Sequence, residues 1–351
     1  MPLDDILRSL LTAHGPSGYE TAPAAAWRAA CEPFAEVHVD VMGSCTATVP
    51  GTAGGLTVAI VGHIDEIGLV ITHITEKGFL RFTGIGGWDG QVLVGQRVAI
   101  ATRDGEVPGV IGHKPPHLTE PDDRKKAVEL KNLHIDIGAK DADDARKLVR
   151  VGDVAVIAGD PVELPNDRVV SRSMDNRLGC YVAQQAAKLV ADEGGAPGDV
   201  VAVAAVQEEI TFGGAHTVAH ALKPDVAIVV DVGHETDAPG VEPGEIGEHA
   251  FGSGPILERG STLHPAVFEA LHDAAESIGD PFTVAASAGR TGTDADAIHL
   301  SRAGIPTGLV GLPLRYMHSA VEMVQLSDVH TAAKVIAAFC RRLEPGTTFE
   351  R

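Results

Sequence analysis

The sequence predicts an α/β fold, a doubly wound mixed sheet flanked by helices, with a small β-rich domain inserted into it. Two observations predict the sheet. Runs 56–61, 200–206 and 226–230 are apolar and β-branched without polar alternation, which is typical of strands buried on both faces. Segments with helical periodicity lie between and around them. The insertion is predicted by a third observation, because residues from about 68 to 165 change to short strands divided by Gly, Asp and Pro turns.

The helices are predicted from apolar spacing and from residues that favour helix ends. One segment carries apolar residues on one face from Leu178 to about Ala191. A second begins with Pro265 and ends before Gly279. A third amphipathic segment covers 326–343. Together with the buried runs, these segments predict a discontinuous α/β domain made of residues 1–67 and 166–351, which we expect to be the catalytic domain.

The predicted insertion, residues 68–165, contains strand-like segments at 78–83, 97–102 and 154–158 and one helix-like piece at 142–149. The insertion lies outside the buried apolar runs and has no evident catalytic role. We therefore expect a β-barrel-like domain that does not supply the reactive groups.

Composition excludes several classes of protein. The chain has 351 residues, 44% hydrophobic and 22% charged, so it is globular and long enough for two domains. Its formal charge of −20 argues against binding to nucleic acids or anionic membranes, and it suits a protein that concentrates metal cations. No uncharged run is long enough to span a membrane. Acidic residues near the first Met and four scattered cysteines favour a cytoplasmic protein with reduced thiols.

The candidate site residues follow the buried runs. The first run leads to His63 and Asp65, the second to Glu208 and Glu209, and the third directly to Asp231. In open α/β sheets, ligands bind at the carboxyl ends of the strands, so these side chains are expected at one place. Each motif alone has an ordinary explanation, such as a local hydrogen bond, a solvated surface or a turn. Their coincidence favours metal-ligand chemistry.

Two further residues extend this set. Asp175 precedes the predicted helix at 178, where an acidic residue ordinarily serves the helix N-terminus. His318 ends the strand-like run that begins at Leu309. Most other histidines have no comparable context.

These motifs, in this order, resemble the co-catalytic metallo-aminopeptidases, and most closely the tetrahedral (TET) aminopeptidase family, metallopeptidase family 42. Some members of that family carry glutamyl-aminopeptidase or endoglucanase labels. The likeness extends from Gly15 to Glu322 and rests on the following segments: His63-x-Asp65, Ser173-Met174-Asp175-Asn176, Gln207-Glu208-Glu209, Asp231, 292–306 and Arg315-Tyr316-Met317-His318. Related lid-domain exopeptidases and deacylases carry their insertion later in the chain, and they remain a weaker alternative.

The resemblance implies two divalent metal ions per subunit, with zinc or cobalt favoured. One ion takes His63 and Asp231, the other takes Glu209 and His318, and Asp175 bridges both. Three carboxylates and a bridging hydroxide would then balance the charge of the two ions. Asp65 is expected to hold the second ring nitrogen of His63.

By the same resemblance, Glu208 is the general base for the metal-bridging water that attacks the peptide bond. Because neighbouring residues on a strand point to opposite sides, Glu208 and Glu209 are expected to serve different roles. The implied activity is release of N-terminal residues from short peptides. A glycosidase using the paired glutamates and a non-catalytic metal-binding protein are the competing hypotheses.

Specificity and assembly stay open at this level. Candidates for the specificity pocket are the turn at 251–254, Arg290 and Leu314–Arg315, which the sequence does not rank. The resemblance implies that the insertion mediates dimerisation and that dimers form a hollow tetrahedron of twelve subunits. A lid or solubility domain on a smaller oligomer is the alternative.

Overall fold

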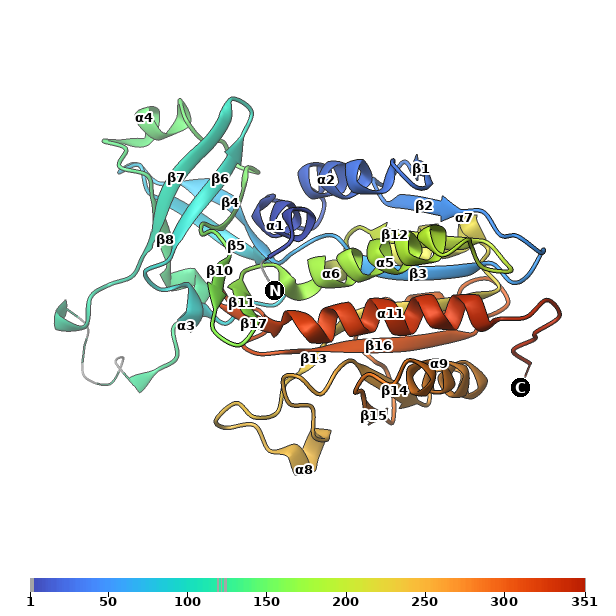
Figure 1. Cartoon of the computed structure of the whole chain (residues 1–351). Coiled ribbons are helices and arrows are strands. Elements are labelled where there is room, and N and C mark those ends of the chain that lie inside the picture. The colour runs from blue at the N-terminus through green and yellow to red at the C-terminus, as the bar shows by residue number, and fades with distance from the viewer. Residues whose placement is uncertain (1–2, 119, 121, 123–124, 351) are drawn as a thin grey trace.

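The computed structural model describes residues 3–118, 120, 122 and 125–350. Its largest element is a mixed sheet of eight strands (Figure 1). In spatial order the strands are β1 (Glu36–Val39), β2 (Cys45–Val49), β12 (Val200–Ala205), β3 (Val58–His63), β13 (Val226–His234), β16 (Thr307–Leu314), β14 (Ile256–Gly260) and β15 (Thr283–Ser287).

The middle of this sheet is parallel, as the buried apolar runs predict. Strand β3 pairs in parallel with β12 on one side and with β13 on the other, and β13 pairs in parallel with β16. All residues of β3 and β12 are buried. The predicted α/β fold with its mixed sheet is therefore confirmed. Parallel strands place their carboxyl ends at one edge, and this edge carries the site described below.

Helices cover both faces of the sheet. One face carries α1 (Asp5–Thr12), α2 (Thr21–Cys31), α5 (Met174–Asp192), α9 (Pro265–Ile278) and α11 (Leu326–Arg342). The other face carries α7 (Gly213–Leu222) and α10 (Ala295–Ile298). Among the described residues, none of the helices combines the length and the apolar character needed to cross a lipid bilayer.

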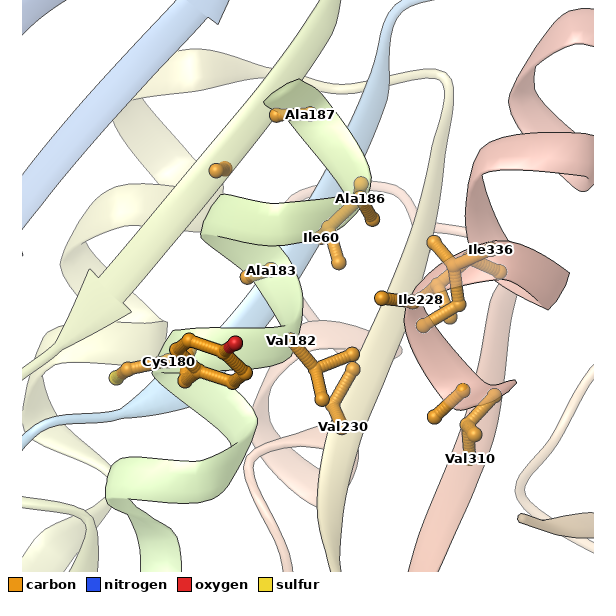
Figure 2. Packing of buried hydrophobic residues seen from close by; sticks show 14 of the residues in the cluster. Ile60, Cys180, Val182, Ala183, Ala186, Ala187, Ile228, Val230, Val310 and Ile336 are labelled. Atoms are coloured by element: carbon orange, nitrogen blue, oxygen red, sulfur yellow. The ribbon is translucent and has the colours of Figure 1, made fainter. Parts of the chain in front are cut away.

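Side chains alternate between the two cores because successive strand residues point to opposite faces. Ile60, Ile228 and Val310 pack against α5 and α11, where Figure 2 shows Ala183 and Ile336 among their neighbours. The intervening strand residues belong to the core under α7 and α10: Ala59, Val61, Val201, Val203, Ala227, Val229 and Leu309.

Helix α5 lies close against the central strands because glycines meet at the contact. A Cβ on Gly62 would lie 2.3 Å from the carbonyl carbon of Gly179, and a Cβ on Gly179 would lie 2.5 Å from the carbonyl oxygen of Val230. Neither position can carry a larger residue without moving the helix. This close contact places the start of α5, and with it Asp175, over the carboxyl ends of β3 and β13.

The inserted segment forms a closed barrel at one end of the molecule (Figure 1). Its strands, in barrel order, are β4 (Gly68–Ile74), β5 (Leu80–Ile85), β8 (His134–Asp136), β7 (Gly105–Gly112), β6 (Arg97–Thr102) and β9 (Val154–Ile157). Where the structure describes this region, its short helices are α3 (Gly90–Leu93), α4 (Ala142–Arg146), η1 (Pro116–Leu118) and η3 (Leu130–Asn132). Helix α4 ends earlier than the predicted 142–149.

A small antiparallel sheet joins the barrel to the larger sheet. Its strands are β10 (Val162–Leu164), β11 (Arg168–Ser171) and β17 (Glu322–Gln325). Strand β10 follows the barrel in sequence but pairs with β11, which leads directly to α5. The remaining short helices are α6 (Glu208–Thr211) and α8 (Pro243–Ile246).

Candidate metal centre

A cavity of about 530 Å³ opens at the carboxyl ends of the parallel strands. His63, Asp175, Glu208, Glu209, Asp231 and His318 all line it. The structure thus brings together the residues that the sequence selects from five separate segments. Asp65 is fully buried behind them and does not line the cavity.

The backbone departs from regular geometry where it presents these side chains. His63 is the last residue of β3. Asp175 is in the first turn of α5 but has non-helical dihedral angles (φ −77°, ψ 104°), after Ser173 in the left-handed region. His318 follows β16 and also has a positive φ of 58°. Left-handed conformations of non-glycine residues are uncommon and cluster at functional sites.

Two details of the sequence-based account are wrong. Asp231 does not end its strand, because β13 continues to His234. Glu208 and Glu209 are not strand neighbours on opposite faces: the chain turns at Gln207 (φ 61°), and both glutamates form the first turn of α6. Both therefore reach the cavity, and strand alternation does not separate their roles.

Asp175 lies between the two histidines. Its Oδ1 is 3.1 Å from Nε2 of His63, and its Oδ2 is 3.4 Å from Nε2 of His318. The other distances extend this arrangement on both sides: Glu209 Oε1 is 3.5 Å from His318 Nε2, and Glu208 Oε2 is 3.7 Å from His63 Nε2. Each carboxylate oxygen of Asp175 thus faces a different histidine.

The pKa values indicate an excess of buried negative charge. Burial raises the pKa of Glu208 to about 10, and burial together with neighbouring carboxylates raises the pKa of Asp231 well above its usual range. Burial would also raise the pKa of Asp175, but hydrogen bonds with His318 and His63 outweigh it and hold that pKa low. Hydrogen bonds with Asp175 and Glu209 raise the pKa of His318 to about 11. Two histidines face four carboxylates here, so even protonated histidines leave an excess of negative charge.

This arrangement fits divalent metal ions. Ligand atoms of His63, Asp175 and Glu209 lie within 4.8 Å of one another, and so do those of His63, Glu208 and Asp231. Two tetrahedral zinc ligands are about 3.3 Å apart, which matches the distances of Asp175 to its two histidines. Glu209 Oε1 is buried, and its contact with Nε2 of His318 at 3.5 Å is too long for a regular hydrogen bond. A metal ion would partner this oxygen and neutralise its neighbours.

Asp65 holds several parts of the site from behind. Its Oδ1 lies 3.3 Å from Nδ1 of His63, although the ring nitrogen is not aligned for a regular hydrogen bond. Its carboxylate also accepts hydrogen bonds from Ser17 Oγ (2.6 Å) and from the backbone N–H groups of Glu208 (3.0 Å) and Glu209 (3.2 Å). Asp65 therefore fixes the first turn of α6 as well as facing the imidazole ring.

Glu322 is a second buried carboxylate that fixes backbone groups of the site, and no sequence motif singles it out. Its Oε1 accepts a hydrogen bond from the backbone N–H of His318 (2.9 Å), and its Oε2 accepts one from the backbone N–H of Asp175 (3.2 Å). One side chain thus joins two segments of the site. The signal in the sequence is weak, since Glu322 is a single acidic residue four positions after His318.

Of the residues considered for specificity, Arg290 lines the cavity and the others do not. The Arg315 guanidinium binds the carboxylate of Glu235 and lies 4.5 Å from the Phe251 ring centre. The cavity is lined instead by Glu245 and Glu258, which the sequence analysis did not select.

Histidines and carboxylates gathered at the carboxyl ends of parallel strands are typical of an α/β protein with a metal site. Comparisons with known proteins then give its family. Residues 43–335 match the family model described as M42 glutamyl aminopeptidase, so the chain belongs to this family. It is a hydrolase that acts on peptide bonds, and the family is metal-dependent.

Individual relatives cover nearly the whole chain. A TET aminopeptidase structure from a Thaumarchaeota archaeon is 36% identical with a TM-score of 0.92, covering 97% of this chain and 96% of its own. The lysyl aminopeptidase of Pyrococcus furiosus is 32% identical, covering 88% of each chain. The Pyrococcus horikoshii TET1 peptidase, described as able to assemble into a tetrahedron or a large octahedral shell, is 30% identical with a TM-score of 0.85, covering 97% of this chain and 99% of its own.

Proposed function

We propose that this chain is an aminopeptidase with two divalent metal ions that releases N-terminal residues from short peptides. The observation that carries this proposal is the position of Asp175, whose two carboxylate oxygens face two different histidines at 3.1 and 3.4 Å. A carboxylate that offers one oxygen to each side suits a bridge between two metal ions. A site for one ion would not need both histidines around a shared carboxylate.

In this proposal His63 and Asp231 hold one ion, Glu209 and His318 hold the other, and Asp175 is shared. Each ion then has three protein ligands, which leaves room for water and substrate as a catalytic site requires. Mixed histidine and carboxylate ligands suit zinc or cobalt. When bound, the pair of ions would supply Lewis-acid activation of the attacking water and of the peptide carbonyl.

Glu208 is the proposed general base. It lines the cavity beside His63 but is not needed to complete either set of three ligands. Its carboxylate would take a proton from the attacking water and deliver it to the leaving amine. Without cations, burial raises the pKa of Glu208 to about 10, so the positive charge of the two ions would be needed to keep this carboxylate ionised and able to accept the proton.

We also propose that residues 68–165 form a dimerisation domain and that the dimers assemble into a tetrahedral dodecamer. The closed barrel at one end of the molecule supports this division, because none of the described residues that line the cavity comes from it (Figure 1). The loop after β5 does come close: a Cβ on Gly86 would lie 3.2 Å from Oε2 of Glu209, and one on Gly87 would lie 3.3 Å from Nδ1 of His318. The assembly described for the Pyrococcus horikoshii relative supports the tetrahedron. Light scattering on the metal-loaded protein tests it: a mass near twelve times 36.5 kDa is expected, and a stable monomer would contradict it.

The activity is tested by metal analysis combined with an aminopeptidase assay. Leucyl-, lysyl- and glutamyl-anilides are offered to the purified protein with and without a chelator, and metal is then added back. We expect two equivalents of metal per chain, hydrolysis of at least one anilide, loss of activity with the chelator and recovery with zinc or cobalt. Hydrolysis of a glycan such as carboxymethyl cellulose, without anilide hydrolysis, would favour the glycosidase hypothesis instead.

A further inference from the structure

One wall of the cavity carries an acidic residue to which the proposed mechanism assigns no role. Strand β14 presents Ile256 and Glu258 to the cavity, while Leu257 between them points into the core under α9. The neighbouring strand adds Ala285, which pairs with Glu258. The same cavity is lined by the apolar side chains of Val232, Ile246, Ala286 and Met317, and also by the polar residues His234, His249, Ser287, Thr291 and Thr293.

Glu258 makes no hydrogen bond or ion pair with any residue that the structure describes. The side chain is half-buried, and burial alone raises its pKa above the usual range. Its neighbour along the strand, Arg259, is directed elsewhere, with its guanidinium near Glu269 and over the ring of Phe268. A carboxylate that is partly desolvated without a partner is costly, and a cationic ligand would remove that cost.

The positive charge at the cavity is already paired. Arg290 is the only arginine or lysine among the described residues that line it. Its Nε lies 3.2 Å from Oδ2 of Asp296, and its guanidinium stacks over the ring of Phe212. Glu245 adds a further carboxylate to the lining. The wall away from the metal ligands therefore offers net negative charge and apolar surface.

We propose that this wall binds the side chain of the substrate's N-terminal residue and that Glu258 selects lysine or arginine there. This inference rests on the proposed aminopeptidase function. Long cationic side chains place their methylene groups on apolar surface and keep the charged head at a polar group. Here Ile256 and Met317 would contact the methylene groups, and the Glu258 carboxylate would bind the ammonium or guanidinium head.

Other N-terminal residues fit this wall less well. A glutamate side chain would face Glu258 with a like charge. A leucine side chain would fill apolar space but leave the Glu258 carboxylate without a partner. A site built around a polar group discriminates against ligands that leave this group unpaired.

The first test compares substrates on the metal-loaded enzyme. We expect the wild type to give higher kcat/KM for lysyl- and arginyl-anilide than for leucyl- and glutamyl-anilide. The isosteric substitution Glu258→Gln is expected to lower kcat/KM for lysine and arginine by about 10- to 100-fold, the range for a hydrogen bond to a charged group, with leucine nearly unchanged. Glu276→Gln, which removes an exposed carboxylate of α9 outside the cavity, is the matched control and is expected to behave as wild type.

Two outcomes would overturn the inference in this assay. One is a wild type that prefers the glutamyl or leucyl substrate. The other is an equal loss for all substrates in Glu258→Gln, which would mean that Glu258 binds a part common to every peptide, such as the α-amino group.

A binding measurement separates failure of this inference from failure of the proposed function. Calorimetric titration compares L-lysine with L-norleucine, which has a similar stem without the ammonium head. Tighter binding of lysine, lost in Glu258→Gln, is expected even if no anilide is turned over. Equal binding of the two amino acids would overturn the role of Glu258 while leaving an observed aminopeptidase activity intact.

Discussion

The carboxylate of Asp65 accepts a hydrogen bond from the backbone N–H of Glu208 (3.0 Å), so the loop after β3 fixes the start of the helix that carries the proposed base. The same carboxylate accepts the N–H of Glu209 at 3.2 Å. The N–H groups at the start of α6, which have no partner within the helix, thus gain their acceptor from the loop after β3. Although the sequence indicates Asp65 as a partner of His63, its larger structural role is to join two strand exits.

Replacing Asp65 by asparagine is expected to weaken metal binding and activity while preserving the fold. Asparagine keeps one acceptor oxygen but turns an N–H₂ group toward one of the N–H donors and loses the charge beside His63. Metal affinity and kcat/KM should each fall by about 10- to 100-fold, as for other partners of metal ligands. Circular dichroism checks the fold, and metal titration checks the affinity.

Asp225→Asn is the matched control for this substitution. Asp225 also accepts a backbone hydrogen bond, from Thr57 N–H at 2.8 Å, but at the opposite end of the same strands. Its substitution should leave metal affinity and kcat/KM unchanged. An equal loss of affinity in both variants would show that Asp65 acts only through general stability.

Glu208→Gln is expected to retain the metal but to lower kcat by roughly 10²–10⁴, the usual contribution of general acid–base catalysis. Glutamine has nearly the same shape but cannot accept and return a proton at its carboxamide. The measurement is kcat together with metal content on one preparation. A near-normal rate would remove Glu208 from the mechanism.

Stability should depend on pH through Glu20, which is buried beside the site. Its Oε1 accepts the N–H groups of Gly18 (2.6 Å) and Gln207 (3.1 Å), and burial raises the pKa of its carboxyl to about 7. The pKa of this carboxyl in the unfolded chain is about 4.5. Between pH 4.5 and pH 7, Glu20 is therefore ionised in the unfolded chain while it is still largely protonated in the folded protein. Glu20 therefore lowers the stability as the pH rises through this window, and it has no such effect below it.

Glu20→Gln is accordingly expected to stabilise the protein above pH 7, by on the order of 1–3 kcal/mol, and to change little at pH 4.5. Glutamine keeps the acceptor oxygen for both N–H groups. Urea unfolding at several pH values measures the difference, with the exposed Glu36→Gln as control. A difference that does not change with pH would contradict the assignment.

The central sheet and most of the site could be predicted from the sequence because both depend on short segments. Buried parallel strands are apolar throughout, so they can be recognised in the sequence. A polar residue directly after such a strand lies at the carboxyl edge of the sheet, where ligands bind. His63 and the Glu208–Glu209 pair follow from this rule. The same rule selects Asp231, although β13 continues to His234. It succeeds there because the last residues of β13, from Asp231 on, already line the cavity.

The remaining features depend on contacts between distant segments. Glu322 binds two backbone groups, one of them 147 positions earlier in the chain, and this contact exists only once β17 pairs with β11. Glu258 lines the cavity because β14 runs antiparallel to β16, next to the edge strand β15. Glu208 and Glu209 do not continue the strand, because Gln207 takes a left-handed conformation and the chain turns there into α6. Strand periodicity does not indicate this turn.

The central claim, that Asp175 bridges two metal ions, is tested most directly by counting metal in Asp175→Ala. Elemental analysis of the wild type should give two divalent ions per chain. The variant should lose both ions, because each ion loses one ligand. The negative charge between the two cations is also removed, so they repel each other more strongly. Glu208→Gln, analysed in parallel, should keep two, and circular dichroism should show that both variants are folded. A folded Asp175→Ala protein that retained two ions and full activity would contradict the account.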